Sequence, residues 1–187
     1  MRIVVLVSGT GSNLQAVIDA VADGSLPLEI AAVGADRPDT FGVERSAAAG
    51  LDTFVVNFKD YATRTDWDAA LLDAVAAYKP DYVISSGFMR IVAPSFINAF
   101  AGRYVNTHPA LLPSFPGAHG VRDAMAYGVK VTGCTVHFAD AGVDTGPIIA
   151  QTPVTVRPDD TEDTLHERIK VAERELLIQV LADLARG

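Results

Sequence analysis

An asparagine and a histidine stand two residues apart in the segment "YVNTHPALLPSFPG", where an apolar run ends and a proline-rich loop begins. Residues i and i+2 of a strand point to the same face, so we expect Asn106 and His108 to project together. An amide can donate a hydrogen bond to an oxygen that gains negative charge, and an imidazole can move a proton near neutral pH. The pair therefore indicates a catalytic site, against the simpler interpretation of a structural histidine.

Two carboxylates occur in the later segment "DAGVDTGPII", between two apolar stretches. If this loop folds back over the strand ends, Asp144 meets His108 and favours the charged form of its imidazole. In the other interpretation, Asp140 and Asp144 belong to a polar hairpin tip, where aspartate and glycine are common.

The segment "SGTGSN" lies between a predicted strand and a predicted helix. Glycines at such a turn let the backbone approach a ligand, and free N–H groups at the helix start attract a phosphate. The dinucleotide-binding pattern is incomplete, because Gly9 and Gly11 are followed by Leu14 at the third glycine position, and the Walker lysine is absent. A phosphate site and a tight turn without a ligand both fit.

The segment "SSGFMRIV" surrounds Arg90 with apolar residues just after a predicted strand. It fits the wall of a pocket for a flat ring, and equally a strand-to-helix turn whose apolar side chains belong to the core.

Apolar β-branched runs alternate with segments of helical periodicity, which predicts βαβ units. The predicted strands are 2–7, 29–35, 53–56, 81–87, 104–108, 131–138 and 148–156. The predicted helices are one that begins at 12 and continues through 21, followed by 42–50, 66–78, 94–100, 121–127 and 161–184. The first helix is expected to begin with a capping box of Ser12 and Gln15. The predicted fold is α/β, a mostly parallel mixed β-sheet with helices on both faces. Ligands of such folds bind beyond the carboxyl ends of the strands, so the loops 8–13, 87–92 and 106–113 should share one edge.

Composition narrows the class of protein. The chain has 187 residues, 49% of them hydrophobic, and a net charge of −8, which predicts a single domain over residues 1–187 and disfavours nucleic-acid binding. No segment approaches the roughly 20 apolar residues of a membrane span, and the apolar run near the N-terminus is too short for a signal sequence. A single cysteine, Cys134, fits a cytoplasmic location. His119, His137 and His166 lack metal-ligand spacing, so no metal is predicted.

The four motifs "SGTGSNLQA", "SSGFMRIV", "NTHPALLPSFPG" and "DTGPII", in this order and spacing, resemble the folate-dependent phosphoribosylglycinamide formyltransferases over nearly the whole chain. The resemblance implies a Rossmann-like formyltransferase fold. It also implies transfer of a formyl group from 10-formyltetrahydrofolate to the amine of glycinamide ribonucleotide, in purine biosynthesis. Family members work on small molecules, without nucleic acid or membrane, as monomers or homodimers.

The resemblance also implies roles for particular residues. The catalytic residues would be Asn106, His108 and Asp144. The substrate-binding residues would be Gly11, Ser12, Asn13, Lys170 and Glu173. The folate-binding residues would be Arg64, Met89, Arg90, Ile91, Val92, Asn106, Asp140 and Asp144.

The sequence departs from the family in three places. Ala110 replaces a usual serine, Lys170 replaces a frequent glutamine, and relatives tend to continue with a further short strand where this sequence ends at Gly187. Lys170 either contacts the substrate phosphate or forms a solvated helix pair with Glu173, three residues away.

Other functions remain open at this level. A methionyl-tRNA formyltransferase shares the His-Pro-x-Leu-Leu-Pro core, but that family adds a C-terminal domain and must hold tRNA. A formyltetrahydrofolate hydrolase adds an N-terminal regulatory domain. An NAD(P)-dependent oxidoreductase or other nucleotide-binding module built on "SGTGSN" would lack the third glycine.

Overall fold

Short parallel strands of apolar residues form the centre of the first of two structural units. The computed structural model describes residues 1–187, which divide into the units Met1–Val105 and Asn106–Gly187. The boundary between the two units falls inside a strand. The expectation of a single domain over residues 1–187 stays a prediction.

The strand order in the first unit is β3-β2-β1-β4. These strands are β1 (Arg2–Val7), β2 (Glu29–Ala35), β3 (Thr53–Val55) and β4 (Tyr82–Ser85). β1 pairs parallel with β2 and β4, and β2 pairs parallel with β3. The side chains from Ile3 to Val7 are fully buried, as expected for a parallel strand covered on both faces.

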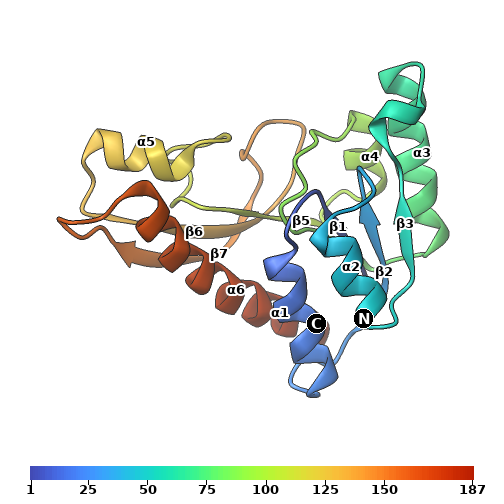
Figure 1. Ribbon diagram of the computed structural model, residues 1–187, viewed down its shortest axis with the longest axis horizontal. Helices are drawn as coiled ribbons and strands as arrows, with labels where there is room; N and C mark the ends of the chain where they lie inside the picture. The colour runs from blue at the N-terminus through green and yellow to red at the C-terminus, as the bar shows by residue number, and fades with distance from the viewer. The chain divides into compact units, whose positions relative to one another are not determined.

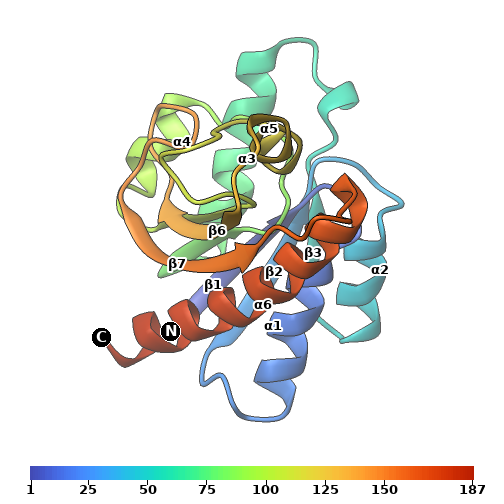
Figure 2. The same ribbon diagram turned by 90° about the vertical axis from the view of Figure 1, so that its left-hand side faces the viewer.

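Helices cover both faces of this part of the sheet. They are α1 (Ser12–Ala22), α2 (Phe41–Ala48), α3 (Arg64–Ala77) and α4 (Pro94–Ala99), with a 3-10 turn, η1 (Phe58–Asp60), before α3. Figures 1 and 2 show α1 and α2 on one side of the strands and α3 on the other. α1 contacts α2, and α3 contacts α4.

A buried tryptophan joins three segments of the first unit. The Trp67 indole N–H donates to the Val56 carbonyl at 2.8 Å, which satisfies its polar atom inside the core. Phe58 meets the Trp67 ring edge-on and Phe88 stacks against it. These contacts anchor the start of α3 next to the turn that follows β4.

The second unit holds the order β5-β6-β7. β5 (Tyr104–His108) begins in the first unit and ends in the second, while β6 (Val131–Phe138) and β7 (Ile148–Thr155) pair antiparallel. α5 (Gly120–Tyr127) contacts α6 (Glu162–Arg186), and α6 packs along β6 and β7. α6 buries an apolar stripe that includes Leu165, Ile169, Leu176 and Val180.

Alternation along the strands separates two faces of the second unit. The Thr107 hydroxyl donates to Glu173 of α6 at 2.8 Å. Asn106 and His137 lie one residue away from side chains of β5 and β6 that face α6. They therefore point to the other face of the sheet, where they meet each other. The polar side chains of interest therefore lie on the sheet face opposite α6.

The α/β class and the mostly parallel mixed sheet are confirmed, with strand and helix ends displaced by at most two residues. η1 was not predicted, because one turn leaves no periodicity to detect. The capping box at Ser12 is wrong: Gly11 is the N-cap, in a left-handed conformation, and no side chain caps the helix. Gln15 instead donates to Asp19 and accepts from Arg45. No helix of the chain combines the length and apolarity required to cross a bilayer.

The N-cap of α6 offers a test of local stability. Thr161 accepts a hydrogen bond from the Thr164 N–H at 3.2 Å, in a reciprocal capping box. Replacing this cap in Thr161→Ala should lower the free energy of unfolding by about 1 kcal/mol, measured by urea denaturation. Thr161→Ser keeps the hydroxyl and should retain most of that stability. Equal losses in both variants would mean that the threonine methyl group, not the cap, is responsible.

Candidate active site

The Asp144 carboxylate is the centre of a buried polar cluster in the second unit. Asp144 Oδ2 accepts the Gly117 N–H at 2.8 Å and lies 3.3 Å from His108 Nδ1. Asp144 Oδ1 lies 3.6 Å from His137 Nε2. The loop after β6 therefore folds back onto the end of β5, as expected for a carboxylate that acts with His108.

Tight backbone packing brings Asp144 to this place. Asp144 adopts a positive φ of 55°, a conformation that aspartate and asparagine tolerate better than most residues. A Cβ on Gly146 would lie 1.8 Å from the Phe138 carbonyl oxygen, so only glycine allows the loop to return to β6. Asp140 closes the same loop by accepting from Gly142 N–H and the Thr145 hydroxyl at 2.9 and 2.7 Å.

Hydrogen bonds from β6 and β7 hold the proline-rich loop after His108. The Thr135 hydroxyl donates to the Ala110 carbonyl at 2.7 Å and accepts the Leu112 N–H at 3.1 Å. The Gln151 amide donates to the Leu112 carbonyl at 2.8 Å. The loop is therefore restrained by the neighbouring strands as well as by its prolines.

His108 is buried, and both of its ring nitrogens face oxygen. Nδ1 faces Asp144, and Nε2 lies 2.7 Å from the Phe115 carbonyl oxygen. A Cβ on Gly120 would lie 3.0 Å from Nε2, so the glycine at the start of α5 makes room for the ring. Asn106 is only half-buried, and its Nδ2 lies 3.4 Å from His137 Nε2.

The environment of Asp144 favours its charged form. The hydrogen bond with His137 contributes most to lowering the pKa of Asp144 below its ordinary value, and the Gly117 N–H and the positive charge of His108 add to it, whereas burial opposes the shift. A permanently charged carboxylate can stabilise a proton on a neighbouring imidazole. The cluster thus brings together an amide donor, an imidazole and a charged carboxylate.

The residues of the first unit that are expected to bind folate form a group of their own. Arg64 of α3 donates to the Ile91 carbonyl, and pairs with Asp68 at 2.9 Å. Met89 and Ile91 are 74% and 73% exposed, which leaves apolar surface open beside a cation. Val92 is half-buried.

Arg90 turns toward a residue that the sequence did not single out. Its Nε donates to Asp36, buried at the end of β2, at 2.8 Å, and its guanidinium lies 4.4 Å above the Phe58 ring. Part of Arg90 is therefore committed within the protein, and the rest remains exposed.

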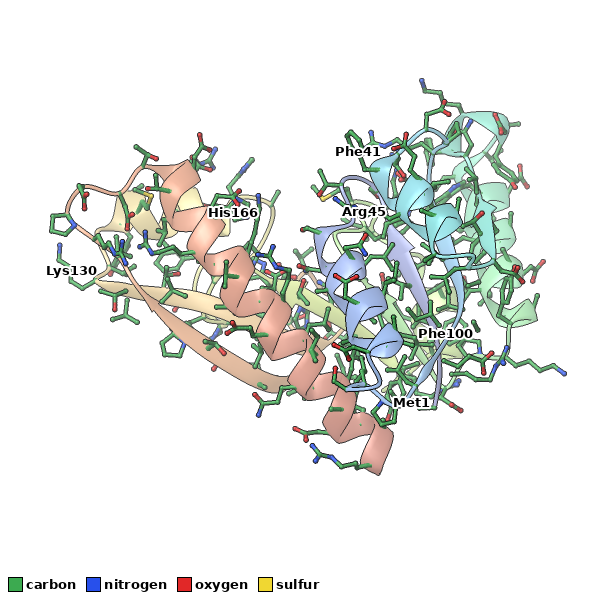
Figure 3. All side chains as sticks on the ribbon, turned by 60° about the horizontal axis from the view of Figure 1, so that its bottom comes forward. Met1, Phe41, Arg45, Phe100, Lys130 and His166 are labelled. Atoms are coloured by element: carbon green, nitrogen blue, oxygen red, sulfur yellow. The ribbon has the colours of Figure 1, made fainter.

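The turn after β1 packs against α2. A Cβ on Gly11 would lie 2.9 Å from the Gly42 Cα, and the Gly42 N–H donates to the Gly9 carbonyl at 3.1 Å. Arg45 of α2, which Figure 3 labels, donates to the Thr10 carbonyl at 2.8 Å. Ser12 and Asn13 open α1, so their N–H groups belong to its first turn. The Met89 N–H donates to the Ser8 hydroxyl at 2.9 Å, which places the loops after β1 and β4 at one sheet edge.

Lys170 pairs with a glutamate other than Glu173. Its ammonium lies 2.7 Å from Glu167, a partner that neither of the two alternatives for Lys170 named. Glu173 is buried and accepts from the Thr107 hydroxyl at 2.8 Å, because that position of α6 faces the sheet.

Sequence reasoning missed the role of His137 in the cluster. It was considered only as a metal ligand, and no group of three or more His, Cys, Asp or Glu side chains suited to a metal ion is present. The available signal was its place near the end of β6, directly before the Asp144 loop. Thr135 and Arg45 gave no signal, since their partners are backbone carbonyls distant in sequence.

Comparison with known proteins identifies the class. The formyl transferase family model matches residues 1–181, and the chain belongs to this family. A phosphoribosylglycinamide formyltransferase of Mycobacterium tuberculosis is 56% identical over 184 residues, covering 98% of this chain and 85% of that protein. The enzyme of the same name from Escherichia coli is 40% identical over 187 residues, covering 100% and 88%. The crystal structure of glycinamide ribonucleotide transformylase 1 from Symbiobacterium toebii superposes with a TM-score of 0.96 at 44% identity, covering 100% of this chain and 88% of that one.

The close approach of Gly11 to α2 predicts a large effect of a single methyl group. Gly11→Ala places a Cβ against Gly42 at a positive φ of 65°, so the free energy of unfolding should fall by about 1–2 kcal/mol or more. Gly9→Ala is the matched control, because nothing lies within 4 Å of its added Cβ. Thermal or urea unfolding of both variants measures the difference. Equal stability of the two would contradict the close packing of this turn.

The charge of Asp144 predicts a pH-dependent contribution to stability. Because the pKa is lower in the folded than in the unfolded chain, this stability is fully present above the ordinary pKa of 3.8 and is lost as the pH falls through the folded value. Asp144→Asn keeps the backbone conformation and an acceptor for Gly117, but removes the charge. The difference in unfolding free energy between the two proteins should therefore be larger near pH ~6 than near pH ~3. A constant difference over this range would mean that the charge contributes nothing.

Proposed function

We propose that this chain transfers a formyl group from 10-formyltetrahydrofolate to the amine of glycinamide ribonucleotide, in purine biosynthesis. The observation that carries the proposal is the approach of Asp144 to His108 at 3.3 Å, on the sheet face that also holds Asn106. Further support comes from the formyl transferase family, to which the chain belongs, and from relatives that are named for this reaction, one of them 56% identical.

The three residues supply what amine formylation requires. The carbonyl oxygen of the formyl group gains negative charge as the amine attacks, so a preorganised donor lowers the barrier. Asn106 is the donor, and His108, paired with Asp144, moves the proton that the amine must lose and the leaving nitrogen must gain. The negative charge of Asp144 pairs with His108 while the imidazole holds the proton.

The residues near Arg64 fit a folate. Exposed Met89 and Ile91 offer apolar contact to a flat ring, and Arg64 and Arg90 offer positive charge to an acidic tail. Val92 and the loop from Asp140 to Asp144 complete the set of proposed folate contacts. Bound folate supplies the formyl group, and the protein supplies position and protons.

The glycinamide ribonucleotide phosphate fits the turn of Gly11, Ser12 and Asn13. Free N–H groups at the start of α1 and its dipole favour an anion there. Lys170 and Glu173 are further proposed contacts to the ribonucleotide, Lys170 to its phosphate. We further propose that the protein acts without a metal, as a monomer or homodimer in the cytoplasm, and binds neither nucleic acid nor membrane.

The direct test is incubation of the purified protein with 10-formyltetrahydrofolate and glycinamide ribonucleotide, with tetrahydrofolate measured spectroscopically. Formation of tetrahydrofolate only when the ribonucleotide is present supports the proposal. Formation without any acceptor would indicate a hydrolase, and formation only with methionyl-tRNA would indicate a different acceptor. Either result would overturn the proposed acceptor.

The proton-transfer role of His108 predicts a large loss of turnover. His108→Ala should lower kcat by roughly 10²–10⁴, with smaller changes in KM for both substrates. His166→Ala is the matched control, because His166 lies on the partly exposed start of α6 (Figure 3) and takes no part in the cluster. Near-normal turnover of His108→Ala would remove this residue from the mechanism.

The lysine at position 170 predicts a salt-dependent effect on substrate binding. If Lys170 exchanges Glu167 for the substrate phosphate, Lys170→Gln should raise KM for glycinamide ribonucleotide several-fold while kcat stays nearly unchanged. The effect should shrink at high salt, because partly exposed charges are screened. Lys130→Gln, at an exposed position before β6, controls for the loss of one charge. Equal KM values for wild type and Lys170→Gln at low salt would leave Lys170 as a surface residue.

A further inference from the structure

His137 is buried at 1% exposure, yet the proposed reaction assigns it no role. Its Nδ1 lies 3.0 Å from the Phe138 carbonyl oxygen. A carbonyl can only accept a hydrogen bond, so Nδ1 carries the proton that occupies this contact.

The other ring nitrogen of His137 faces two groups of opposite character. Nε2 lies 3.4 Å from the amide nitrogen of Asn106, a donor, and 3.6 Å from Asp144 Oδ1, an acceptor. With Nδ1 protonated, a neutral ring has a lone pair at Nε2 and accepts from Asn106. A charged ring has a proton there, donates to Asp144 and turns a donor against the Asn106 N–H. The contribution of His137 to the lowered pKa of Asp144 belongs to this charged ring. The separation of 3.6 Å is longer than an ordinary hydrogen bond, and with a neutral His137 the Gly117 N–H and His108 still lower the pKa of Asp144.

His108 differs from His137 in this respect. Both of its nitrogens face acceptors, the Phe115 carbonyl and Asp144 Oδ2, so the charged ring satisfies both contacts. Asp144 is the charged group that contacts His137, and it also pairs with His108. The residue paired with His137 across β7 is the apolar Ile148. One carboxylate balances one positive charge, and a second buried cation beside it would be costly.

We infer that neutral His137, protonated at Nδ1, is a positioning residue that accepts one amide N–H of Asn106 and leaves the second for the oxygen that gains negative charge. This inference rests on the proposed formyl transfer. The amide of asparagine is planar and carries two donors on one nitrogen, so anchoring one N–H sets the direction of the other. Without the acceptor at His137, the amide is free to turn its carbonyl oxygen toward the reacting oxygen, where it repels. With His137 neutral, the proton that the reaction transfers is carried by His108.

The tautomer is tested directly by NMR of the protein labelled with ¹⁵N-histidine, without substrates. The His137 ring signals are assigned by their loss in His137→Gln. At a pH of about 7.5, well above the ordinary histidine pKa, the ring should show a protonated Nδ1 and an unprotonated Nε2. A proton at Nε2, in either the other neutral tautomer or the charged ring, would overturn the inference.

The link to Asn106 is tested by a double-mutant cycle. His137→Leu removes the acceptor and should lower kcat about tenfold, a part of the roughly 10²–10³ that an oxyanion donor contributes, while KM for both substrates stays within about twofold. His137→Gln is neutral and carries a side-chain carbonyl that can take the place of Nε2, so it should recover most of kcat. In the Asn106→Ala background, His137→Leu should cost less than about twofold more, because residues that act as one unit are not additive.

The same cycle contains the results that would overturn the inference. A full tenfold loss from His137→Leu in the Asn106→Ala background would mean that His137 acts through another group, such as Asp144. Equal losses from Leu and Gln would exclude the acceptor role. If His137→Leu does not fold, His137→Gln and the NMR tautomer still decide. Failure of wild-type formyl transfer would overturn the proposed function alone, because the NMR experiment requires no turnover.

Discussion

The buried carboxylate of Asp144 is the constraint on which the rest of the site depends. A charged group inside a protein is tolerated only when it is paired and hydrogen-bonded. Here the loop after His108 supplies an N–H from Gly117, β5 supplies the imidazole of His108, and β6 supplies His137. Satisfying one carboxylate therefore brings the end of β5, the loop after it and the end of β6 to one point.

Glycines make this convergence possible, since they stand where other side chains would collide. Gly146 allows the Asp144 loop to touch the Phe138 carbonyl, and Gly120 makes room for the His108 ring. In the first unit, Gly11 and Gly42 let the turn after β1 lie directly on α2. A loop that surrounds a carboxylate, and a turn that is to bind a phosphate, both require the backbone to come this close to its neighbours.

The two histidines of the cluster illustrate how partners decide protonation. Their residue type is the same and both are buried. His108 lies between two acceptors, whereas His137 lies between a carbonyl, an amide and a carboxylate. The different roles that we propose for them follow from the atoms that each nitrogen meets, because a buried imidazole N–H needs an acceptor.

The order of strands and helices was readable from the sequence alone, because periodicity and punctuation by glycine and proline are local properties. The common face of Asn106 and His108 could also be predicted, because it follows from their spacing on a strand. The place of Asp144 in the candidate site could be predicted from the order of the sequence motifs. Only the tertiary structure decided that Gly11, not Ser12, is the N-cap of α1, that Lys170 pairs with Glu167, and that Asp36 holds Arg90. It also brought His137 to Asn106 and Asp144. These outcomes depend on distances between residues far apart in the chain, and a hydrogen bond forms with whichever partner folding places within about 3 Å.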